Sequence, residues 1–288
     1  HNDARRQRQM CIRDRDKESV SKLFINYDFD GIIHFAAHKS VNESVNYPDK
    51  YFKNNVGSLE NIIYEIQKLK KPMNFIFSSS CTVYGQADSM PINEGFELKK
   101  AESPYGQSKR KCEEILENFH KAGHNFKNIT LRYFNPIGAH PTSLIGELPI
   151  GIPENLVPYI TQTAVGKRDH LTVFGDDYDT NDGTCIRDYI HIMDLAEVHI
   201  TCLEKLMNIK DDSFFNVYNV GTGKGTSVLE LINLFENVNQ LKLNYKIGKR
   251  RDGDVVIAYA DTSKIKNELN WTTTVSYTHL RAHETINH

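Results

Sequence analysis

A serine, a tyrosine and a lysine have the types and spacing that proton transfer at neutral pH requires. Tyr105 and Lys109 are four residues apart in a helical pattern, so their side chains share one helix face. An ammonium group near a phenol favours the phenolate and lowers a pKa that starts near ~10. A Tyr-x-x-x-Lys pair alone is more often part of a solvated helix surface. Here the pair follows an apolar segment that ends in serines, the last of which is Ser80. This arrangement predicts that Tyr105 acts as a base on a substrate oxygen, and that the Ser80 hydroxyl hydrogen-bonds the same oxygen.

Apolar segments alternate with helical patterns along the first half of the chain. Each apolar segment ends in small or polar residues, and each helical pattern has one apolar stripe. This alternation predicts a parallel sheet with crossover helices, whose ligands bind beyond the carboxyl ends of the strands. The expected fold class is α/β, a Rossmann-like doubly wound parallel sheet with a smaller α/β lobe after about residue 138. The expected strands are 31–38, 73–85 and 128–140, and the expected helices are 54–71 and 103–123.

Composition narrows the class of protein. The chain has 288 residues, of which 39% are hydrophobic, and this is enough to bury a sizeable core. Its 35 basic and 37 acidic residues give a net charge of −2, so we expect neither a nucleic-acid nor a membrane partner. The cysteines lack paired or metal-ligand spacing, which predicts reduced thiols in a cytoplasmic protein and no metal site. They are Cys11, Cys81, Cys112, Cys185 and Cys202.

The two ends of the chain differ from the rest. The DNA string ATGTGTATAAGAGACAG encodes Met-Cys-Ile-Arg-Asp and opens an Arg codon, which fits 10–15. Its reverse complement encodes Val-Ser-Tyr-Thr-His, which fits 275–279. We therefore expect 1–15 and 275–288 to be translated sequencing adapter rather than natural protein, and exclude them from fold reasoning.

A glycine-rich turn at 221–225 follows an apolar run and precedes a helical pattern. Such a turn is typical of a phosphate-binding loop. The dinucleotide fingerprint would place its third glycine at Thr226 and an acidic residue at the ribose-binding distance, and neither is present. We interpret the segment as a turn of the smaller lobe and not as a dinucleotide site.

Eight blocks together resemble the UDP-glucose 4-epimerase family of extended short-chain dehydrogenases/reductases, in order, over nearly all of 16–271. They are FIFSSSCTVYG, SPYGQSK, LRYFNPIGAHP, GIPENLVPYI, DGTCIRDYIHIMDLA, YNVGTGKGTSVLEL, KRRDGDVVIAYAD and ELNW. In that family the nucleotide-binding glycine loop lies at the amino-terminus. The resemblance implies that roughly sixty residues, at ~30 per βαβ unit, precede Asp16 in the parent. Residues 16–138 are then a partial NAD-binding domain and 139–274 mainly a UDP-sugar-binding lobe, and we expect the chain as given to be an inactive fragment.

The resemblance implies NAD-dependent inversion at C4 of UDP-hexoses through a transient 4-keto sugar. Tyr105 would take the O4 proton while the C4 hydride passes to NAD and returns to the opposite face. Ser80 would bind O4, and Lys109 would hold the nicotinamide ribose and lower the Tyr105 pKa. The other implied cofactor contacts are Phe35, Ala36, Ala37, Lys39, Asn54 and Phe134. The implied substrate contacts are Asn135, Asn155, Leu156, Thr172, Phe174, Arg187, Arg251, Asp254 and Ala258.

Four of these substrate contacts have a stated chemistry. Arg187 and Arg251 suit a pyrophosphate, because a guanidinium binds it in a fork. Asp254 suits a ribose hydroxyl. Ala258 falls where the family places a residue beside C2 of the sugar, and a small side chain there leaves room for an N-acetyl group. We therefore expect UDP-N-acetylhexosamines as possible further substrates, unless a neighbour such as Tyr259 fills the space.

Three alternatives remain beside the epimerase. A nucleotide-sugar 4,6-dehydratase needs an Asp-Glu pair where this chain has Cys81 and Thr82, which are not competent for eliminating water. A decarboxylase of UDP-glucuronate needs a site for the sugar carboxylate, and no such site is identifiable. A non-catalytic nucleotide sensor is disfavoured by the intact Ser80, Tyr105 and Lys109. The family also implies a homodimer that pairs through helices like 54–70 and 107–121.

Overall fold

The computed structural model describes residues 14–142, 144–147, 149, 151–251 and 254–275. Apart from 14, 15 and 275, the ends expected to be non-native lie outside the described residues. The chain forms two compact units that interleave along the sequence. The first holds the chain up to Gln86, Glu94–Tyr133 and His199–Tyr218, and the second holds Ala87–Asn93, Phe134–Val198 and the chain from Asn219 onward. The sequence predicts a boundary near 138, whereas in the structure 199–218 belongs to the first unit.

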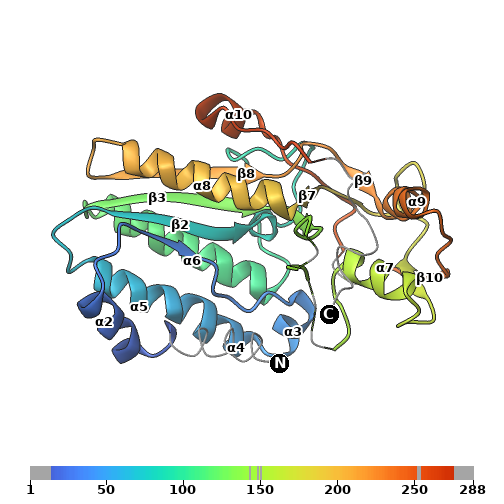
Figure 1. Ribbon diagram of the computed structural model, residues 1–288, viewed down its shortest axis with the longest axis horizontal. Coiled ribbons are helices and arrows are strands. Elements are labelled where there is room, and N and C mark those ends of the chain that lie inside the picture. Colours follow the sequence, from blue (N-terminus) through green and yellow to red (C-terminus); the bar gives the residue numbers. More distant parts are fainter. Residues whose placement is uncertain (1–13, 143, 148, 150, 252–253, 276–288) are drawn as a thin grey trace. The chain divides into compact units, whose positions relative to one another are not determined.

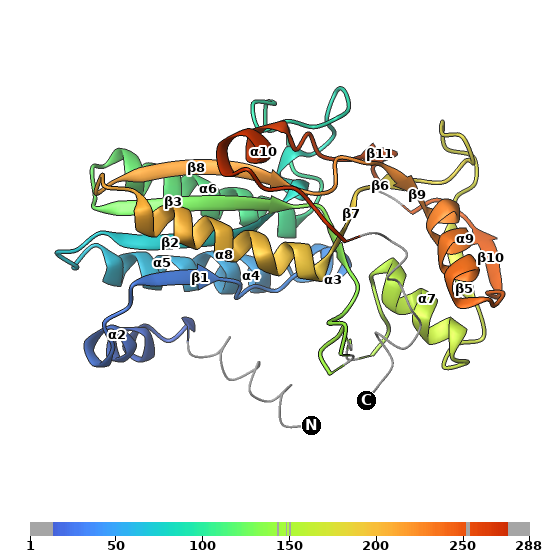
Figure 2. The ribbon, with the colours of Figure 1, turned by 45° about the horizontal axis from the view of Figure 1, so that its top comes forward.

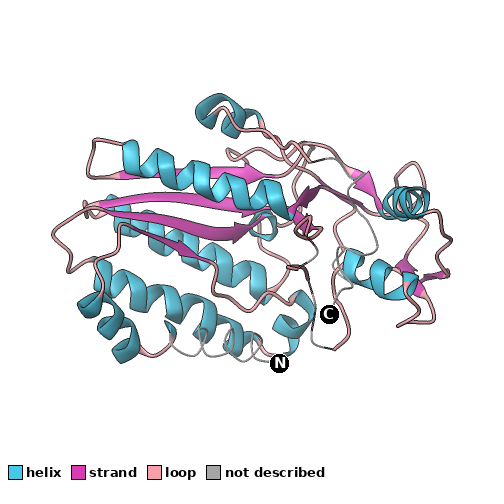
Figure 3. Ribbon diagram, in the orientation of Figure 1, coloured by secondary structure: helices cyan, strands magenta, loops and turns pink. Residues whose placement is uncertain are grey.

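The first unit is built on a four-stranded sheet in the order β1-β2-β3-β8, drawn in magenta in Figure 3. The pairs β1·β2 and β2·β3 are parallel, and Ser80 at the end of β2 lies opposite Tyr133 on β3. β2 is buried along almost its whole length, as expected for a strand covered on both faces. Its strands are β1 (Gly31–His34), β2 (Met73–Ser80), β3 (Phe126–Tyr133) and β8 (Phe214–Val220).

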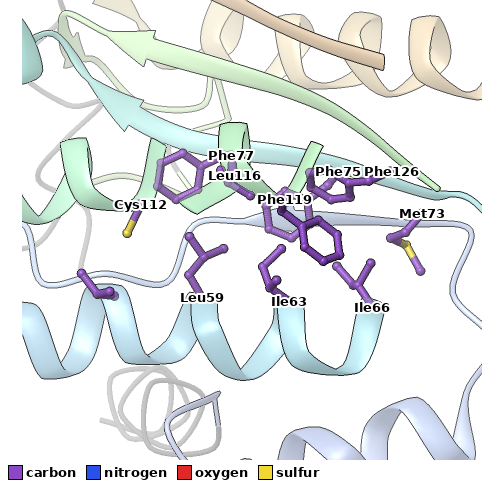
Figure 4. Close-up of a cluster of buried hydrophobic side chains, with 11 residues drawn as sticks. Leu59, Ile63, Ile66, Met73, Phe75, Phe77, Cys112, Leu116, Phe119 and Phe126 are labelled. Carbon is purple, nitrogen blue, oxygen red and sulfur yellow. The ribbon is translucent and has the colours of Figure 1, made fainter. Parts of the chain in front are cut away.

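Helices cover both faces of this sheet (Figures 1 and 2). On one face, the apolar stripe of α5 (Gly57–Ile66) and that of α6 (Pro104–Lys121) pack against β2 and β3, and Figure 4 shows this cluster. On the other face lies α8 (Ile192–Asn208), whose Leu203 reaches Gly31 on β1 so closely that a Cβ there would meet it at 2.8 Å. Fully burying one Leu, Ile or Phe stabilises the fold by about 1.5–3 kcal/mol. The predicted α/β class with a doubly wound parallel sheet is confirmed.

α6 carries the predicted base, and its start is fixed by local chemistry. Pro104 occupies the first turn, where a missing N–H costs nothing. The hydroxyl of Ser103 accepts a hydrogen bond from the Gly106 N–H at 3.1 Å and so caps the helix. Tyr105 therefore lies in the first turn of α6 and Lys109 one turn further on.

The helix expected to begin at residue 54 differs from the prediction. It begins earlier, with α4 (Pro48–Tyr51), and passes through a π-helical segment, η1 (Phe52–Val56), before α5. The wider π turn leaves the consecutive residues Asn54 and Asn55 both buried. A π segment inside a helix frequently marks a functional site. The remaining helices of this unit are α2 (Lys17–Asn26), α3 (Val41–Asn46) and the 3-10 turn η2 (Cys81–Tyr84).

The second unit consists of short strands and helices, as its frequent prolines and glycines predicted. Its main core joins α7 (Leu156–Ala164), β5 (Leu171–Phe174) and α9 (Val228–Asn239). A capping box of Ser227 and Glu230 begins α9. Three small sheets have the orders β10-β5, β11-β6-β9 and β4-β7. The other elements are β4 (Asn135–Ile137), β6 (Ile186–Arg187), β7 (Tyr189–His191), β9 (Thr226–Ser227), β10 (Tyr245–Gly248), β11 (Ile257–Ala258) and α10 (Ser263–Leu269).

Candidate active site

Ser80, Tyr105 and Lys109, here called the Ser-Tyr-Lys trio, come together in the first unit. The Ser80 hydroxyl hydrogen-bonds the Tyr105 phenol. The Nζ atom of Lys109 donates a 2.5 Å hydrogen bond to the carbonyl oxygen of Ser78, two residues before Ser80 on β2. The trio therefore joins the carboxyl end of β2 to one face of α6, as the strand and the four-residue spacing predicted.

Thr82 directs the Ser80 hydroxyl. The Oγ atom of Ser80 accepts hydrogen bonds from the Thr82 hydroxyl at 3.0 Å and from the Thr82 N–H at 3.3 Å. A hydroxyl has two acceptor lone pairs and one proton to donate. With both lone pairs engaged by Thr82, Ser80 presents its proton to the Tyr105 oxygen or to an oxygen bound beside it.

Burial sets the protonation of Lys109. The side chain is 3% exposed and its ammonium lies 4.9 Å from the centre of the Phe77 ring. Burial lowers the pKa of Lys109 to about 8, because a desolvated ammonium loses its hydration. Lys109 is thus mostly charged at pH 7, with the Ser78 carbonyl as its fixed partner.

The Tyr105 pKa differs from the expectation. Burial raises the pKa of Tyr105 to about 12, and the hydrogen bond from Ser80 offsets this only in part. The expected lowering of the Tyr105 pKa by Lys109 is wrong for the protein without ligand, because burial raises this pKa and the opposing contribution comes from Ser80 and not from Lys109. The phenol is therefore a proton donor at neutral pH until further positive charge arrives beside it.

A buried ion pair supports the trio from behind. Arg132 on β3 forms a forked salt bridge to Glu113 on α6, with N–O distances of 2.6–3.2 Å. Ser79 on β2 donates to Glu113 at 2.5 Å, and Arg132 donates to the Tyr84 hydroxyl at 2.9 Å. These contacts tie β2, β3, η2 and α6 together beside Ser80. Removing one partner of a buried ion pair typically destabilises a protein by about 3–5 kcal/mol, so we expect both Glu113 and Arg132 to be needed to hold these elements together.

Asn54 is the strongest of the predicted cofactor contacts. It is 1% exposed, and its Oδ1 atom has no hydrogen-bond partner among the described residues. An unsatisfied buried amide oxygen is costly unless a ligand or water completes it. Its neighbour Asn55 is saturated, because it bonds His38 N–H at 2.8 Å, His38 C=O at 3.1 Å and the Ser108 hydroxyl at 3.0 Å. Asn55 thereby holds the loop after β1 against α6.

The other predicted cofactor contacts occupy two places. Phe35 and Lys39 are exposed, while Ala36 and Ala37 are half-buried, and all four lie in the loop that Asn55 holds. Phe134 is buried in the second unit, where its N–H donates to the Val220 carbonyl at 3.1 Å. The structure thus gathers the loop, Asn54 and the trio in the first unit.

Phe174, Arg187, Arg251 and Asp254, here called the arginine cluster, meet in the second unit. Arg251 forms a forked ion pair to Asp254, at 2.9 and 3.1 Å, and its guanidinium lies 4.9 Å from the Phe174 ring centre. Arg187 lies 3.7 Å from the same carboxylate. Two cations share one anion, so this cluster carries a net charge of +1, which favours an anionic ligand.

Strand register brings further predicted residues to this cluster. Ala258 on β11 is the register partner of Arg187 on β6. Thr172 lies two residues from Phe174 on β5, on the face opposite the buried Leu171 and Val173. Asn135 is half-buried on β4, and β4 pairs with β7. β7 begins directly after Arg187 and Asp188 in the sequence.

Two predicted substrate contacts do not join the arginine cluster through any contact of the described residues. Asn155 precedes α7, and its amide donates to Glu147 at 3.0 Å. Leu156 begins α7 and packs against the core shared with β5. The start of α7 and β5 thus share one hydrophobic core. The polar side chain of Asn155 bonds Glu147 and no residue of β5.

The glycine-rich turn binds an internal anion. The Asp188 carboxylate accepts hydrogen bonds from the Thr222 N–H and hydroxyl, both at 2.7 Å, from Gly223 N–H at 3.0 Å and from Ala260 N–H at 3.1 Å. A Cβ added at Gly221 would overlap this carboxylate, and Gly223 has a φ of +75°. The turn therefore has the backbone geometry of an anion-binding nest, filled by Asp188.

Sequence reasoning missed Thr82, Asn55 and Asp188. Thr82 had been considered only as a departure from the dehydratases. A signal for Asp188 was present, because a glycine-rich turn offers N–H donors and an acidic residue follows Arg187 directly. Nothing in the sequence pattern indicated the π turn that buries Asn55.

The fold and the Ser-Tyr-Lys trio define an extended short-chain dehydrogenase/reductase. A family model described as GDP-mannose 4,6 dehydratase matches residues 5–283. UDP-glucose 4-epimerase of Pasteurella multocida is 48% identical over 260 residues, covering 89% of this chain and 75% of the relative. The chain belongs to the UDP-glucose 4-epimerase family.

Solved structures agree with this assignment. UDP-glucose 4-epimerase of Bifidobacterium longum, in complex with NAD+ and UDP, has a TM-score of 0.87 and 42% identity, covering 94% of this chain and 79% of that one. The UDP-Glc/GlcNAc 4-epimerase of Campylobacter jejuni has a TM-score of 0.77 and 36% identity, covering 94% and 80%. In the part of the chain that the structure describes, no helix is long and apolar enough to cross a membrane.

Proposed function

We propose that this protein interconverts UDP-glucose and UDP-galactose by NAD-dependent epimerisation at C4. The observation that carries the proposal is the Tyr105 phenol, hydrogen-bonded to a Ser80 hydroxyl that Thr82 orients, with the ammonium of Lys109 one helical turn away. The relatives named above carry this activity in their names, and the family assignment supports its transfer to this chain.

In the proposed mechanism the chain's residues handle the proton and the hydroxyl. Ser80 donates to O4 and fixes the sugar hydroxyl beside Tyr105. Tyr105 takes the O4 proton as C4 is oxidised and returns it to the 4-keto sugar after the hexose has turned over. Lys109, held by the Ser78 carbonyl, supplies a fixed positive charge one helical turn along α6 from Tyr105. A positioned acid–base group of this kind contributes typically ~10²–10⁴-fold to rate.

The residues of the first unit fit NAD. The unsatisfied Oδ1 of Asn54 suits an amide or hydroxyl donor, and the loop from Phe35 to Lys39 presents small side chains at Ala36 and Ala37. Lys109 suits the nicotinamide ribose. When bound, NAD accepts the C4 hydride and adds positive charge that lowers the Tyr105 pKa. That added charge accounts for a phenol that is protonated without ligand and acts as a base with it.

The arginine cluster supports UDP as the carrier of the sugar. Guanidinium groups bind pyrophosphate in a fork, and Arg187 and Arg251 lie within reach of one carboxylate, so they lie close together. We assign the pyrophosphate to these arginines, a ribose hydroxyl to Asp254 and the uracil region to Phe174 and Thr172. Asn135, Asn155 and Leu156 complete the proposed substrate contacts, and Phe134 completes the proposed cofactor contacts.

Ala258 supports a wider range of sugars. Its position beside Arg187 on paired strands suits a contact with the hexose next to the pyrophosphate. Tyr259 does not compete for this space, because successive side chains of an extended chain point to opposite faces and the Tyr259 ring packs over Gly225. We infer that UDP-N-acetylglucosamine and UDP-N-acetylgalactosamine are also interconverted. The Campylobacter jejuni relative is named for both sugar classes.

The alternatives have weaker support. Although the matching family model bears the name of a dehydratase, Thr82 is hydrogen-bonded to Ser80, and Cys81 and Thr82 stand where elimination requires a pair of carboxyl groups. For a decarboxylase of UDP-glucuronate, the residues that the structure describes identify no site for the sugar carboxylate. A nucleotide sensor would not require an oriented phenol.

We further propose a cytoplasmic homodimer that pairs through α5 and α6. The support for the homodimer is the family assignment, and the described cysteines form no disulfide with one another, which suits a reducing compartment. Light scattering after size exclusion should give twice the mass of the chain, and a monomer at all concentrations would contradict the dimer.

The test of the proposed function supplies the amino-terminal segment expected from the sequence. A chimera places the corresponding part of the Pasteurella multocida relative before Asp16, and the 288-residue chain is assayed beside it. With UDP-galactose and NAD, the chimera should form UDP-glucose without consuming a reductant. A folded chimera that binds NAD and UDP but never forms UDP-glucose would refute the proposal.

A further inference from the structure

Asp188 is a buried carboxylate that the proposed mechanism does not use. It is 0% exposed, and every one of its polar groups is engaged. Its carboxylate fills the turn at 221–225 through the four hydrogen bonds described above. Its N–H donates to the Ala258 carbonyl at 3.1 Å, and its carbonyl accepts from the Asn135 N–H at 2.9 Å.

These contacts converge on the segments that carry the proposed substrate residues. Asp188 follows Arg187, the last residue of β6, and precedes β7. It bonds the main chain of Ala258 directly, and Ala260 two residues later through its carboxylate. It also bonds the main chain of Asn135 at the start of β4. One residue thus joins three strands that are separate in the sequence.

The charge of Asp188 matters as well as its shape. All four donors to its carboxylate point inward, and an isosteric amide would turn an NH2 group toward one or more of these N–H groups. Burial raises the pKa of Asp188, while the hydrogen bonds from Thr222, Ala260 and Gly223 oppose that rise. A network of this kind is rigid only when every member is satisfied.

We propose that Asp188 is a positioning residue for UDP: by filling the glycine-rich turn, it fixes the main chain from which the Arg187 and Ala258 side chains arise. This inference rests on the proposed function, because it takes Arg187 as a pyrophosphate contact. The glycine-rich turn, which has the form of a phosphate-binding loop, then serves nucleotide binding indirectly, with a carboxylate of the protein where a phosphate would lie.

Asp194 provides a matched control. It is a buried aspartate of the same unit, 1% exposed, and its carboxylate accepts from Thr274 N–H and hydroxyl at 2.9 Å and from Val275 N–H at 3.1 Å. Its partners carry no proposed substrate contact. Asp188→Asn and Asp194→Asn therefore make the same chemical change, and only the first lies beside the arginine cluster.

The experiment is isothermal titration of UDP into the 288-residue chain at low temperature. Irreversibly unfolded protein lowers the number of binding sites without changing the dissociation constant, whereas misplaced contacts raise the dissociation constant at constant site number. A reversibly unfolded fraction would also raise the apparent dissociation constant, so circular dichroism of each variant is compared with that of the unsubstituted chain. We expect Asp188→Asn to weaken UDP about tenfold, or ~1.4 kcal/mol, with the site number unchanged. Asp194→Asn should leave the dissociation constant as it was.

Two further variants extend the test, and the first of them keeps the inference testable if Asp188→Asn does not fold. Thr222→Val removes one hydroxyl donor and should weaken UDP in the same direction by about two- to threefold. In Arg187→Ala, the added Asp188→Asn change should cost clearly less than it does alone, because the residue acts through Arg187.

The outcomes separate the two proposals. If the unsubstituted chain binds UDP but Asp188→Asn and Asp194→Asn behave alike, or if the effects of Asp188→Asn and Arg187→Ala simply add, the positioning role is wrong and the proposed function stands. If only Thr222→Val can be measured and it binds UDP as tightly as the unsubstituted chain, the positioning role is also wrong. If the unsubstituted 288-residue chain binds no UDP, the positioning role is wrong, whereas the proposed function is tested separately by the chimera assay.

Discussion

The Ser-Tyr-Lys trio and the arginine cluster are held by different kinds of structure. The trio stands on a long buried strand and an 18-residue helix, braced by the buried Glu113–Arg132 pair. The arginine cluster stands on strands of two to four residues and on a loop, and its bracing is the bonding of one carboxylate, Asp188, to main-chain groups. Side chains on regular helices and strands can be held to a fraction of an ångström, whereas side chains on short segments need additional hydrogen bonds that hold those segments in place.

The difference predicts that the two regions can be damaged separately, and the largest effect belongs to the trio. Tyr105→Phe in the chimera removes the proton-transfer group and should lower kcat by about 10²–10⁴-fold. UDP affinity should stay within about twofold in titration calorimetry, since the phenol is not a proposed UDP contact. Near-native turnover by Tyr105→Phe would show that the base is another group.

Ala258→Tyr tests the sugar end of the arginine cluster. A phenol ring at this position should clash with an N-acetyl group, and overpacking by several atoms costs about 1–3 kcal/mol or more. Turnover of UDP-N-acetylgalactosamine should therefore fall by about tenfold to a hundredfold, since ~1.4 kcal/mol corresponds to a factor of ten. UDP-galactose turnover, measured in the same coupled assay, should be largely kept. Equal losses for both sugars would contradict a role in selecting the sugar.

Arg251→Ala should have the converse effect to Tyr105→Phe. Losing a charge-assisted contact to the pyrophosphate costs about 1.5–3 kcal/mol, or roughly a tenfold to hundredfold loss of UDP affinity. The kcat at saturating substrate should change much less. Arg250→Ala is the matched control, because Arg250 is exposed and pairs with Asp177 at 2.7 Å. If Arg250→Ala weakens UDP as much as Arg251→Ala, the assignment of the pyrophosphate is wrong.

The smallest expected effect concerns how the stability of the first unit depends on pH. His34 on β1 lies between Phe75 and Phe77, and burial lowers its pKa to about 3. Between that value and ~6.5 the unfolded chain binds a proton at His34 that the native chain does not bind. The free energy of unfolding therefore decreases as the pH falls below ~6.5. From pH 7 to pH 5 the loss should be about 2 kcal/mol.

Urea unfolding at both pH values measures this effect, with His34→Gln as the control that cannot take up the proton. The substituted protein should lose clearly less stability over the same interval. An identical loss in both proteins would mean that His34 is protonated in the native state.

The two regions also differed in how far the sequence could predict them. Tyr105 and Lys109 follow from helical spacing, and Ser80 from the place where an apolar strand turns polar, so the trio was predicted from local pattern. The arginine cluster was named through family resemblance, since its members lie far apart in the sequence. Asp188 bonds Thr222 and Ala260, which are 34 and 72 residues away, and no local pattern reports such pairs.

The Tyr105 pKa could not be predicted for a related reason. The sequence shows the ammonium four residues away but not the depth of burial, and burial is the largest cause of the raised pKa. Likewise, the π turn at η1 was not predicted, because its residues have ordinary helix propensities and its contact with α6 through Asn55 and Ser108 is distant in sequence. The α/β fold itself could be predicted, because alternating strand and helix patterns repeat along the first half of the chain.

The central claim is that the trio moves a proton while the hydrogen on C4 leaves and returns within one active site. The most direct measurement follows UDP-galactose carrying deuterium at C4 through the chimera and analyses the UDP-glucose formed by mass spectrometry. We predict that the product keeps its deuterium at C4 and that no reduced nicotinamide accumulates. Loss of the label to water, or a product that has lost a molecule of water, would contradict the account.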